Sequence, residues 1–145
     1  RSGQGTNGSI TAFYTVLVDA DDMNEPIADA VRGILDGHII LDRGLAQKGH
    51  YPAIDILNSV SRVMDQIVPL EQQQAALNVK RLLSTYREAE DLINIGAYKP
   101  GSNASIDMAL KHIDNIESFT RQAIYEQSTF DETAAQMISQ FKELS

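Results

Sequence analysis

Residues 25–41, EPIADAVRGILDGHIIL, decide the fold because a helical pattern passes here directly into a strand pattern. Pro26 suits the first position of a helix, where its missing N–H removes no hydrogen bond. Apolar residues then recur at helical spacing, at Ile27, Val31, Ile34 and Leu35. Gly37 is a typical helix end, and the HIIL that follows predicts a short buried strand over residues 38–41.

Upstream of this helix, residues 9–18, SITAFYTVLV, are rich in β-branched and aromatic side chains and predict a strand. The two strands and the helix between them make a β-α-β unit of about 30 residues, the size at which a parallel crossover becomes possible. FYTVLV is apolar on both faces, as a central parallel strand is. Since two strands alone do not make a stable sheet, residues 1–68 are interpreted as the last part of a larger α/β domain.

The first turn of the chain carries the pattern G-x-G-x-x-G, as GQGTNG at residues 3–8. This pattern binds a dinucleotide where it follows a strand and opens a helix, because the helix N-terminus then faces the pyrophosphate. Here only two residues precede the pattern, and a strand pattern follows it. We therefore predict a turn that leads into the strand, and no cofactor site in this loop.

Downstream of residues 25–41, the sequence predicts a short helix over residues 43–48, closed by Gly49. Residues 50–64, HYPAIDILNSVSRVM, show little clear periodicity. The sequence changes character near Pro69, after which every segment is helical or a short link. The boundary between two domains is therefore predicted between residues 68 and 69.

Residues 69–145 carry three amphipathic patterns. The first runs from residue 70 to residue 95 and stops at Gly96, a natural helix end. Ser105 is predicted to cap the second helix, and Thr129 with Glu132 has the spacing of a capping box for the third. Three such helices joined by short links predict a small bundle.

The composition excludes several classes of function. The chain has 145 residues, 43% of them hydrophobic, and 12 Lys and Arg against 20 Asp and Glu give a formal charge of −8. This acidic balance argues against nucleic acid and against anionic lipid as a charge-driven partner. No cysteine is present, which excludes disulfides and thiolate zinc sites and suits a reducing compartment. Without a signal peptide or an apolar run of about 18 residues, a cytoplasmic protein is expected.

Residues 8–64 resemble the C-terminal third of the nucleotide-binding domain of type III secretion ATPases, and the long ordered block DDMNEPIAD…ILDGHI…L…GHYPAID…SRVM within them makes the resemblance specific. Within that family they are most similar to the flagellum-specific ATPases. The resemblance continues through NIGAYKPGSNASIDMAL, residues 94–110. These ATPases are related to the catalytic subunits of rotary ATP synthases.

The resemblance implies an α/β then all-α fold: the C-terminal part of a RecA-like P-loop domain over residues 1–68, followed by a small helical domain over residues 69–145. It implies ATP hydrolysis with Mg²⁺ in a hexameric ring, peripheral to the membrane at an export gate, with a coiled-coil stalk and chaperones as partners. The chain contains no G-x-x-x-x-G-K-[ST] motif. We therefore expect a fragment that begins after the P-loop, binds no cofactor by itself and does not hydrolyse ATP alone.

Arg62, in SVSRVM, matches the position of the family's arginine finger. The γ-phosphate of ATP gathers negative charge during transfer, and a guanidinium from a neighbouring subunit stabilises it, an effect on the order of 10³–10⁵ in rate. The resemblance therefore implies a catalytic role in trans for Arg62. The alternative is a surface or salt-bridged arginine.

Three residues match positions that form the adenine pocket in the rotary relatives. Tyr51, in GHYPAID, matches an aromatic side chain that stacks on the base. The alternative for Tyr51 is packing beside Pro52. Tyr98 and Lys99, in AYKPGS, match the side that closes the pocket.

Three carboxylates precede the first helix: Asp19, Asp21 and Asp22. They invite a magnesium hypothesis, but we interpret them as a solvated loop before a helix N-terminus, where the helix dipole favours negative charge. The three histidines lie far apart and lack the H-E-x-x-H spacing, at His38, His50 and His112. No metal site is therefore predicted.

Two other functions remain open. The first is a rotary proton-translocating ATPase subunit. Residues 53–59, AIDILNS, argue against it, because synthase catalytic subunits typically have a proline- and aspartate-bearing version of this segment. The second is a non-enzymatic module whose helices bind a partner. The resemblance also implies that the helices after Pro69 meet the stalk and the chaperones, and exposed acidic residues of the first long helix are candidates for that surface: Glu88, Glu90 and Asp91. The alternative for each is an ordinary charged helix face.

Overall fold

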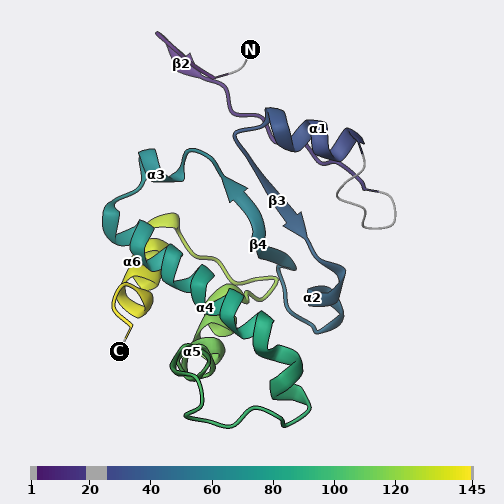
Figure 1. Ribbon diagram of the computed structural model, residues 1–145. Helices are drawn as coiled ribbons and strands as arrows, with labels where there is room; N and C mark the ends of the chain where they lie inside the picture. The colour runs from purple at the N-terminus through teal and green to yellow at the C-terminus, as the bar shows by residue number, and fades with distance from the viewer. Residues whose placement is uncertain (1–2, 19–25, 145) are drawn as a thin grey trace. The chain divides into compact units, whose positions relative to one another are not determined.

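The computed structural model describes residues 3–18 and 26–144 (Figure 1). The chain divides into two units, Arg1–Leu35 and Asp36–Ser145. The first unit holds a short hairpin of β1 (Gln4–Gly5) and β2 (Gly8–Ser9), which pair antiparallel, and helix α1 (Pro26–Ile34). The predicted turn at residues 3–8 and the helix that begins at Pro26 are confirmed.

The strand predicted over residues 9–18 is wrong beyond Ser9, the end of β2. Residues 10–18 form no regular element, and the side chains of Phe13 and Leu17 are both 92% exposed. A strand is stabilised by ladder hydrogen bonds to a neighbour, and none of the described residues pairs with this segment beyond one bond from the nitrogen of Ile10 to the carbonyl of Gly3. The strand-like composition of this segment is therefore not enough to form a strand among the described residues.

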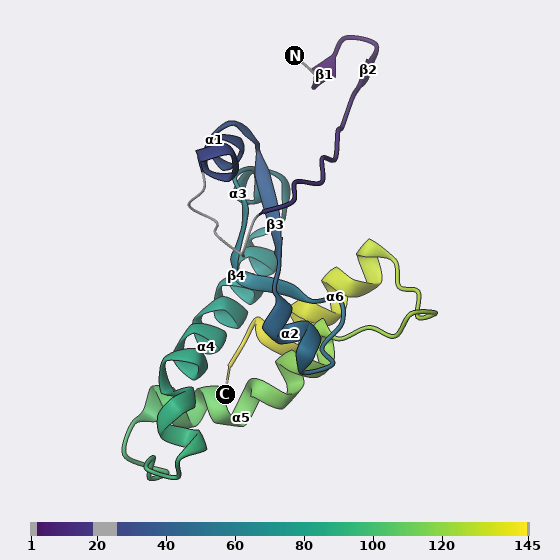
Figure 2. The ribbon, with the colours of Figure 1, turned by 90° about the vertical axis from the view of Figure 1, so that its right-hand side faces the viewer.

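The second unit begins with a two-stranded sheet (Figures 1 and 2). Strand β3 (Gly37–Leu41) is followed by helix α2 (Arg43–Gln47) and strand β4 (Ile54–Ser61), which returns antiparallel to β3. The parallel β-α-β crossover predicted from the sequence is therefore not formed among the described residues. The strand over residues 38–41 is confirmed. It is not buried: Ile39 is 67% exposed, and β4 is the one strand that pairs with β3 in the part of the chain that the structure describes.

Strand β4 contains an irregular insertion opposite β3. His38 pairs with Val60, whereas Ile40 pairs with Asp55, so the register jumps between these two positions. Ser59 bridges the gap: its hydroxyl accepts from the nitrogen of Ile40 and donates to the carbonyl of Asp55. Such a bulge breaks the alternation of side chains, which explains why residues 50–64 show no strand periodicity.

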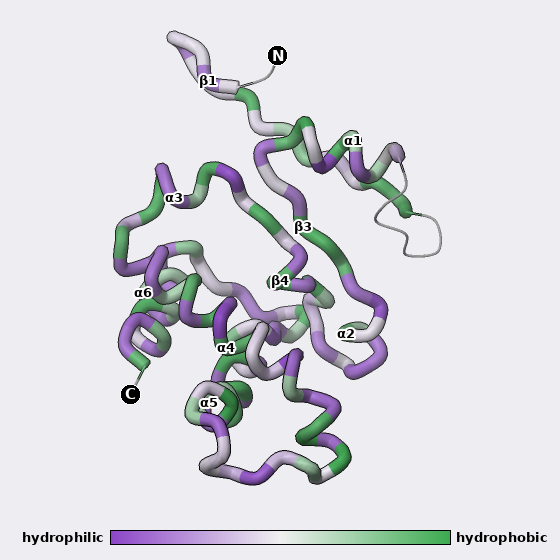
Figure 3. The backbone as a smooth tube through the Cα atoms, in the orientation of Figure 1, coloured by the Kyte–Doolittle hydropathy of each residue, from purple (hydrophilic) through white to green (hydrophobic). Residues whose placement is uncertain are grey.

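The remainder of the second unit is helical. After the short helix α3 (Met64–Ile67) come α4 (Leu70–Asn94), α5 (Ala104–Thr120) and α6 (Phe130–Phe141). Hydrophobic and hydrophilic residues alternate along the tubes of these helices (Figure 3). Helix α4 packs against both α5 and α6. The core between the helices is formed by six buried residues: Ala75, Val79, Leu82, Ala109, Ile116 and Phe141. The predicted small bundle is confirmed.

The helix ends follow from local hydrogen bonds. Thr129 and Glu132 form the predicted capping box of α6. The predicted cap at Ser105 is wrong: Asn103 caps α5, because its side-chain oxygen accepts from the amides of Ser105 and Ile106 and so satisfies the first turn. Helix α4 stops at Gly96 as predicted, and this residue has φ +69°. No helix in residues 3–18 and 26–144 is long and apolar enough to span a bilayer.

Candidate functional site

Arg62 directly follows the end of β4, and its side chain is exposed. Its backbone nitrogen donates to the carbonyl oxygen of Asp36 at 2.8 Å. The preceding residue, Ser61, pairs with Gly37 at the start of β3. The backbone contacts therefore fix the point at which Arg62 leaves the sheet.

Tyr51 lies between α2 and β4, and its side chain is 54% exposed. Its carbonyl oxygen accepts from the backbone nitrogen of Gln122 at 2.8 Å. The neighbouring His50 is buried, with Nε2 3.3 Å from the hydroxyl of Thr120. Both contacts join the segment around Tyr51 to the C-terminal end of α5.

The link between α5 and α6, residues 121–129, is thereby brought beside Tyr51. Ile124 and Tyr125 in this link are 92% and 94% exposed, and Phe130 at the start of α6 is 72% exposed. Sequence reasoning missed this neighbourhood. No motif marks it, and the contact between Gln122 and Tyr51 joins residues far apart in the chain.

Tyr98 and Lys99 lie in the loop at the opposite end of α5. The hydroxyl of Tyr98 donates to the carboxylate of Asp107 at 2.8 Å, and Asp107 also accepts from the nitrogen of Gly101. Lys99 is exposed. Helix α5 has 17 residues, about 25 Å of helix. The structure therefore does not bring Tyr98 or Lys99 to Tyr51 within one chain.

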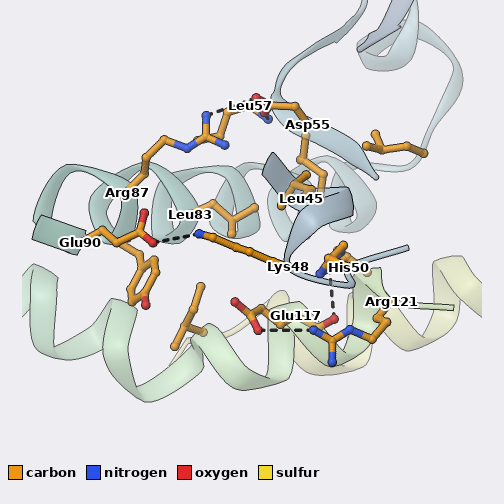
Figure 4. Close-up of a pocket in the computed structure, with 15 residues that line it drawn as sticks. Leu45, Lys48, His50, Asp55, Leu57, Leu83, Arg87, Glu90, Glu117 and Arg121 are labelled. Atoms are coloured by element: carbon orange, nitrogen blue, oxygen red, sulfur yellow. Dashed lines mark hydrogen bonds and ion pairs between the residues drawn. The ribbon is translucent and has the colours of Figure 1, made fainter. Parts of the chain in front are cut away.

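A pocket of about 290 Å³ lies between the segment from α2 to β4 and helices α4 and α5 (Figure 4). Its walls mix apolar side chains such as Leu45 and Leu83 with charged ones. Three ion pairs at its rim have N–O distances of 3.1, 3.4 and 4.0 Å: Lys48–Glu90, Arg87–Asp55 and Arg121–Glu117. Because each of these charges is paired with an opposite one, the pocket presents no surface of a single charge to a ligand. The pairs Lys48–Glu90 and Arg87–Asp55 instead connect the α2–β4 segment to helix α4.

Asp55 is the buried member of this group, 5% exposed. One carboxylate oxygen accepts from the nitrogens of Leu57 and Asn58, and the other accepts from the Asn58 amide and from Arg87. Burial raises the pKa of the Asp55 carboxyl, but the hydrogen bonds from Asn58 and Arg87 together outweigh burial and hold this pKa below its ordinary value. Asp55 therefore stays ionised and fixes the bulge of β4.

Replacing Asp55 by asparagine is expected to lower the free energy of unfolding at pH 7 by about 1–3 kcal/mol, because buried donors lose a charged acceptor. A lowered folded-state pKa adds stability above the ordinary value of 3.8, and this stability is lost as pH falls through the folded-state pKa. The difference in unfolding free energy between wild type and Asp55→Asn should therefore narrow as pH falls below the ordinary value of 3.8. Urea unfolding at several pH values measures the gap, with the exposed Asp91→Asn as control. A gap that stays constant with pH contradicts this role.

The described residues contain no group of three or more possible metal ligands. Asp19, Asp21 and Asp22 lie outside those residues. His38 and His50 have separate partners, the carbonyl of Asn58 and the hydroxyl of Thr120.

Two protein families match successive parts of the chain. The family described as the nucleotide-binding domain of the ATP synthase alpha/beta family matches residues 1–61. The family described as the T3SS EscN ATPase C-terminal domain matches residues 68–139. The first match ends at residue 61 and the second begins at residue 68.

Relatives with high identity come from flagellar and secretion systems. The flagellum-specific ATP synthase of Bacillus subtilis is 54% identical over 139 residues, which are 96% of this chain and 32% of that protein. The type 3 secretion system ATPase of Xanthomonas euvesicatoria is 52% identical over 133 residues, 92% of this chain and 30% of that protein. The chain thus spans about a third of the length of these relatives.

Solved structures give the same result. The assembled ATPase EscN from the type III secretion system of enteropathogenic E. coli is 44% identical, with a TM-score of 0.87 over 94% of this chain and 33% of that one. EscN in complex with its central stalk EscO is 42% identical, with a TM-score of 0.85 over 99% of this chain and 33% of that one. The chain therefore belongs to the family of flagellum-specific and type III secretion ATPases, and it corresponds to their C-terminal part.

Proposed function

We propose that this chain is the C-terminal part of an ATPase that energises protein export through a flagellar or type III secretion apparatus. The observation that carries the proposal is the succession of two family matches, a nucleotide-binding domain followed by the C-terminal domain of a secretion ATPase. The P-loop and the ligands of Mg²⁺ would come from the preceding part of the complete ATPase, since this sequence has no P-loop motif. ATP and Mg²⁺ are thus cofactors of the complete protein.

In this proposal Arg62 is an arginine finger that acts in trans. Strand β4, with its 8 residues, separates Arg62 from Tyr51, about 26 Å of extended chain before the bulge is counted. One nucleotide lying against Tyr51 is poorly placed to reach Arg62 of the same chain. An exposed guanidinium at the sheet end suits the nucleotide of a neighbouring subunit, and the assembled state of the similar EscN supports a hexameric ring.

Tyr51 is proposed to stack on adenine, since half of its side chain is exposed. Tyr98 and Lys99 remain a prediction for the other side of the base. Because the length of α5 separates them from Tyr51, Tyr98 and Lys99 would contact a different adenine from the one that stacks on Tyr51 of the same chain.

Replacing Tyr51 by alanine in the complete ATPase is expected to weaken nucleotide binding by about 1–3 kcal/mol, the contribution of one stacked base, while Tyr51→Phe retains affinity. Titration with a fluorescent ATP analogue measures the dissociation constant. Tyr98→Ala and Lys99→Ala, measured in parallel, test the second side of the pocket. An unchanged affinity in Tyr51→Ala would assign this side chain to packing beside Pro52.

The partners follow from the same proposal. EscN has been solved with its central stalk EscO, and a coiled-coil stalk is the partner we propose for the helical part of this chain. Export-gate proteins and chaperones are proposed to meet the same part, at the cytoplasmic face of the membrane. Glu88 and Asp91 are exposed on α4 and are candidates for such contacts.

Phosphate release from ATP tests the proposal as a whole. The complete protein should hydrolyse ATP, and the 145-residue chain alone should not. If the native gene encodes only these residues, or if the complete protein lacks hydrolysis in its assembled state, the interaction-module function replaces the enzymatic one.

A further inference from the structure

The backbone of Arg62 is held by two consecutive residues of the opposing segment. Its nitrogen donates to the carbonyl of Asp36 at 2.8 Å. Gly37 pairs with Ser61, and this is the last pair of the β3–β4 ladder. Because the ladder ends there, these two contacts fix the place at which Arg62 leaves the sheet.

Gly37 has no room for a side chain. A Cβ atom at this position would lie 2.7 Å from the carbonyl oxygen of Val60 and 3.4 Å from the Cα of Ser61. Both are backbone atoms, so no side-chain rotation relieves the contact. The close approach of the two strands therefore requires glycine, and it occurs directly before Arg62.

We propose that Asp36 and Gly37 form a positioning element for Arg62, in which the Asp36 carbonyl and the missing side chain of Gly37 set where the guanidinium projects from the sheet end. This inference rests on the proposed arginine finger. An added methyl group at Gly37 pushes the peptide between Val60 and Ser61 away and displaces Arg62 with it. A misplacement of about 1 Å in a reacting group costs on the order of 10² in rate.

The test is Gly37→Ala in the complete ATPase. We expect kcat to fall on the order of 10² and the melting temperature to fall by a few degrees because the strand must shift, while nucleotide affinity stays near that of the wild type. A structural defect would instead lower the melting temperature and the affinity together. The matched control is Gly33→Ala in α1, where an added Cβ meets nothing within 4 Å, and its kcat should stay unchanged.

A double variant separates positioning from other effects. If Gly37 acts through Arg62, Gly37→Ala should cause no further loss of kcat in an Arg62→Ala background. An additive loss there, or a normal kcat in Gly37→Ala alone, overturns the positioning role and leaves the arginine finger intact. Normal hydrolysis by Arg62→Ala alone overturns the proposed function itself.

Should Gly37→Ala fail to fold, Ser61→Gly perturbs the same point from the other strand. Ser61 is exposed and precedes Arg62, so glycine there loosens the backbone without removing a buried side chain. We expect a lower kcat that again disappears in the Arg62→Ala background. An unchanged kcat in Ser61→Gly overturns the proposal.

Discussion

Replacing Arg62 by alanine in the complete ATPase is expected to lower kcat by a factor on the order of 10³–10⁵, the contribution measured for arginine fingers in phosphoryl transfer. The physical reason is that negative charge on the γ-phosphoryl oxygens grows toward the transition state. A guanidinium from the sheet end stabilises that charge most strongly at the transition state. Steady-state phosphate release measures the effect.

The binding of ATP should change little in Arg62→Ala, because the finger contributes to the transition state more than to the ground state. Arg62→Lys keeps the charge but loses the planar fork of the guanidinium, so only part of the rate should remain. Arg81→Ala removes an exposed arginine of α4 and serves as the matched control. Near-normal hydrolysis by Arg62→Ala would leave Arg62 as a surface arginine.

A mixing experiment tests whether the finger acts between subunits. One variant carries Arg62→Ala and an intact P-loop, and the other carries Arg62 and a P-loop lysine replaced by alanine. Each homogeneous ring should be inactive. In mixed rings, a subunit with an intact P-loop meets an intact Arg62 at some interfaces, so activity should return. Two inactive variants that stay inactive when mixed would contradict action in trans.

The helices could be predicted from the sequence because their signals are local. Helix α4 occupies Leu70–Asn94, against a predicted span of residues 70–95, since its apolar stripe and the stop at Gly96 lie within the segment itself. The capping box of Thr129 and Glu132 is local in the same way. The cap of α5 was misassigned by two residues, because Asn103 and Ser105 both favour N-caps and the sequence does not show which one reaches the free amides.

The sheet could not be predicted in the same way, because its determinants lie far apart in the sequence. The alternating pattern that would identify strand β4 in the sequence is broken by the bulge at Asp55. This bulge depends on contacts with β3 and with Arg87. Residues 10–18 have the composition of a strand, but no described residue supplies a ladder partner. Propensity describes a segment, whereas a sheet needs pairing between segments.

The candidate site shows the same division. The resemblance pointed to Arg62 and Tyr51, but not to what holds them. The hydrogen bond from Gln122 to the carbonyl of Tyr51, and the one from Arg62 to the carbonyl of Asp36, involve backbone atoms. Backbone contacts leave little trace in residue type. Gly37 is the exception, because its close approach to Val60 requires glycine. From the sequence alone, however, this glycine is explained by a helix end, and only the pairing of the two strands reveals the close approach.

The second large effect is expected for Phe141→Ala, which should lower the free energy of unfolding by about 3–5 kcal/mol. Phe141 is fully buried where α6 meets α4 and α5. Its ring lies edge-on to Phe119 with centroids 5.6 Å apart, and its carbonyl accepts from the buried Asn78 at 2.8 Å. Alanine leaves a cavity between three helices and loses the ring pair. Since domains have about 5–15 kcal/mol of stability in all, this one change removes a large share.

Thermal and urea unfolding of the 145-residue chain, followed by circular dichroism, measure this loss. Phe130→Ala is the matched control, because it removes the same side chain from the first turn of the same helix, where Phe130 is 72% exposed. Its effect should stay within about 0.5 kcal/mol. Phe141→Leu keeps most of the buried area and should cost about 1 kcal/mol, the value of an aromatic pair. Equal losses for Phe130→Ala and Phe141→Ala would mean that α6 does not dock on α4 and α5 in solution, and the core would then consist of α4 and α5 alone.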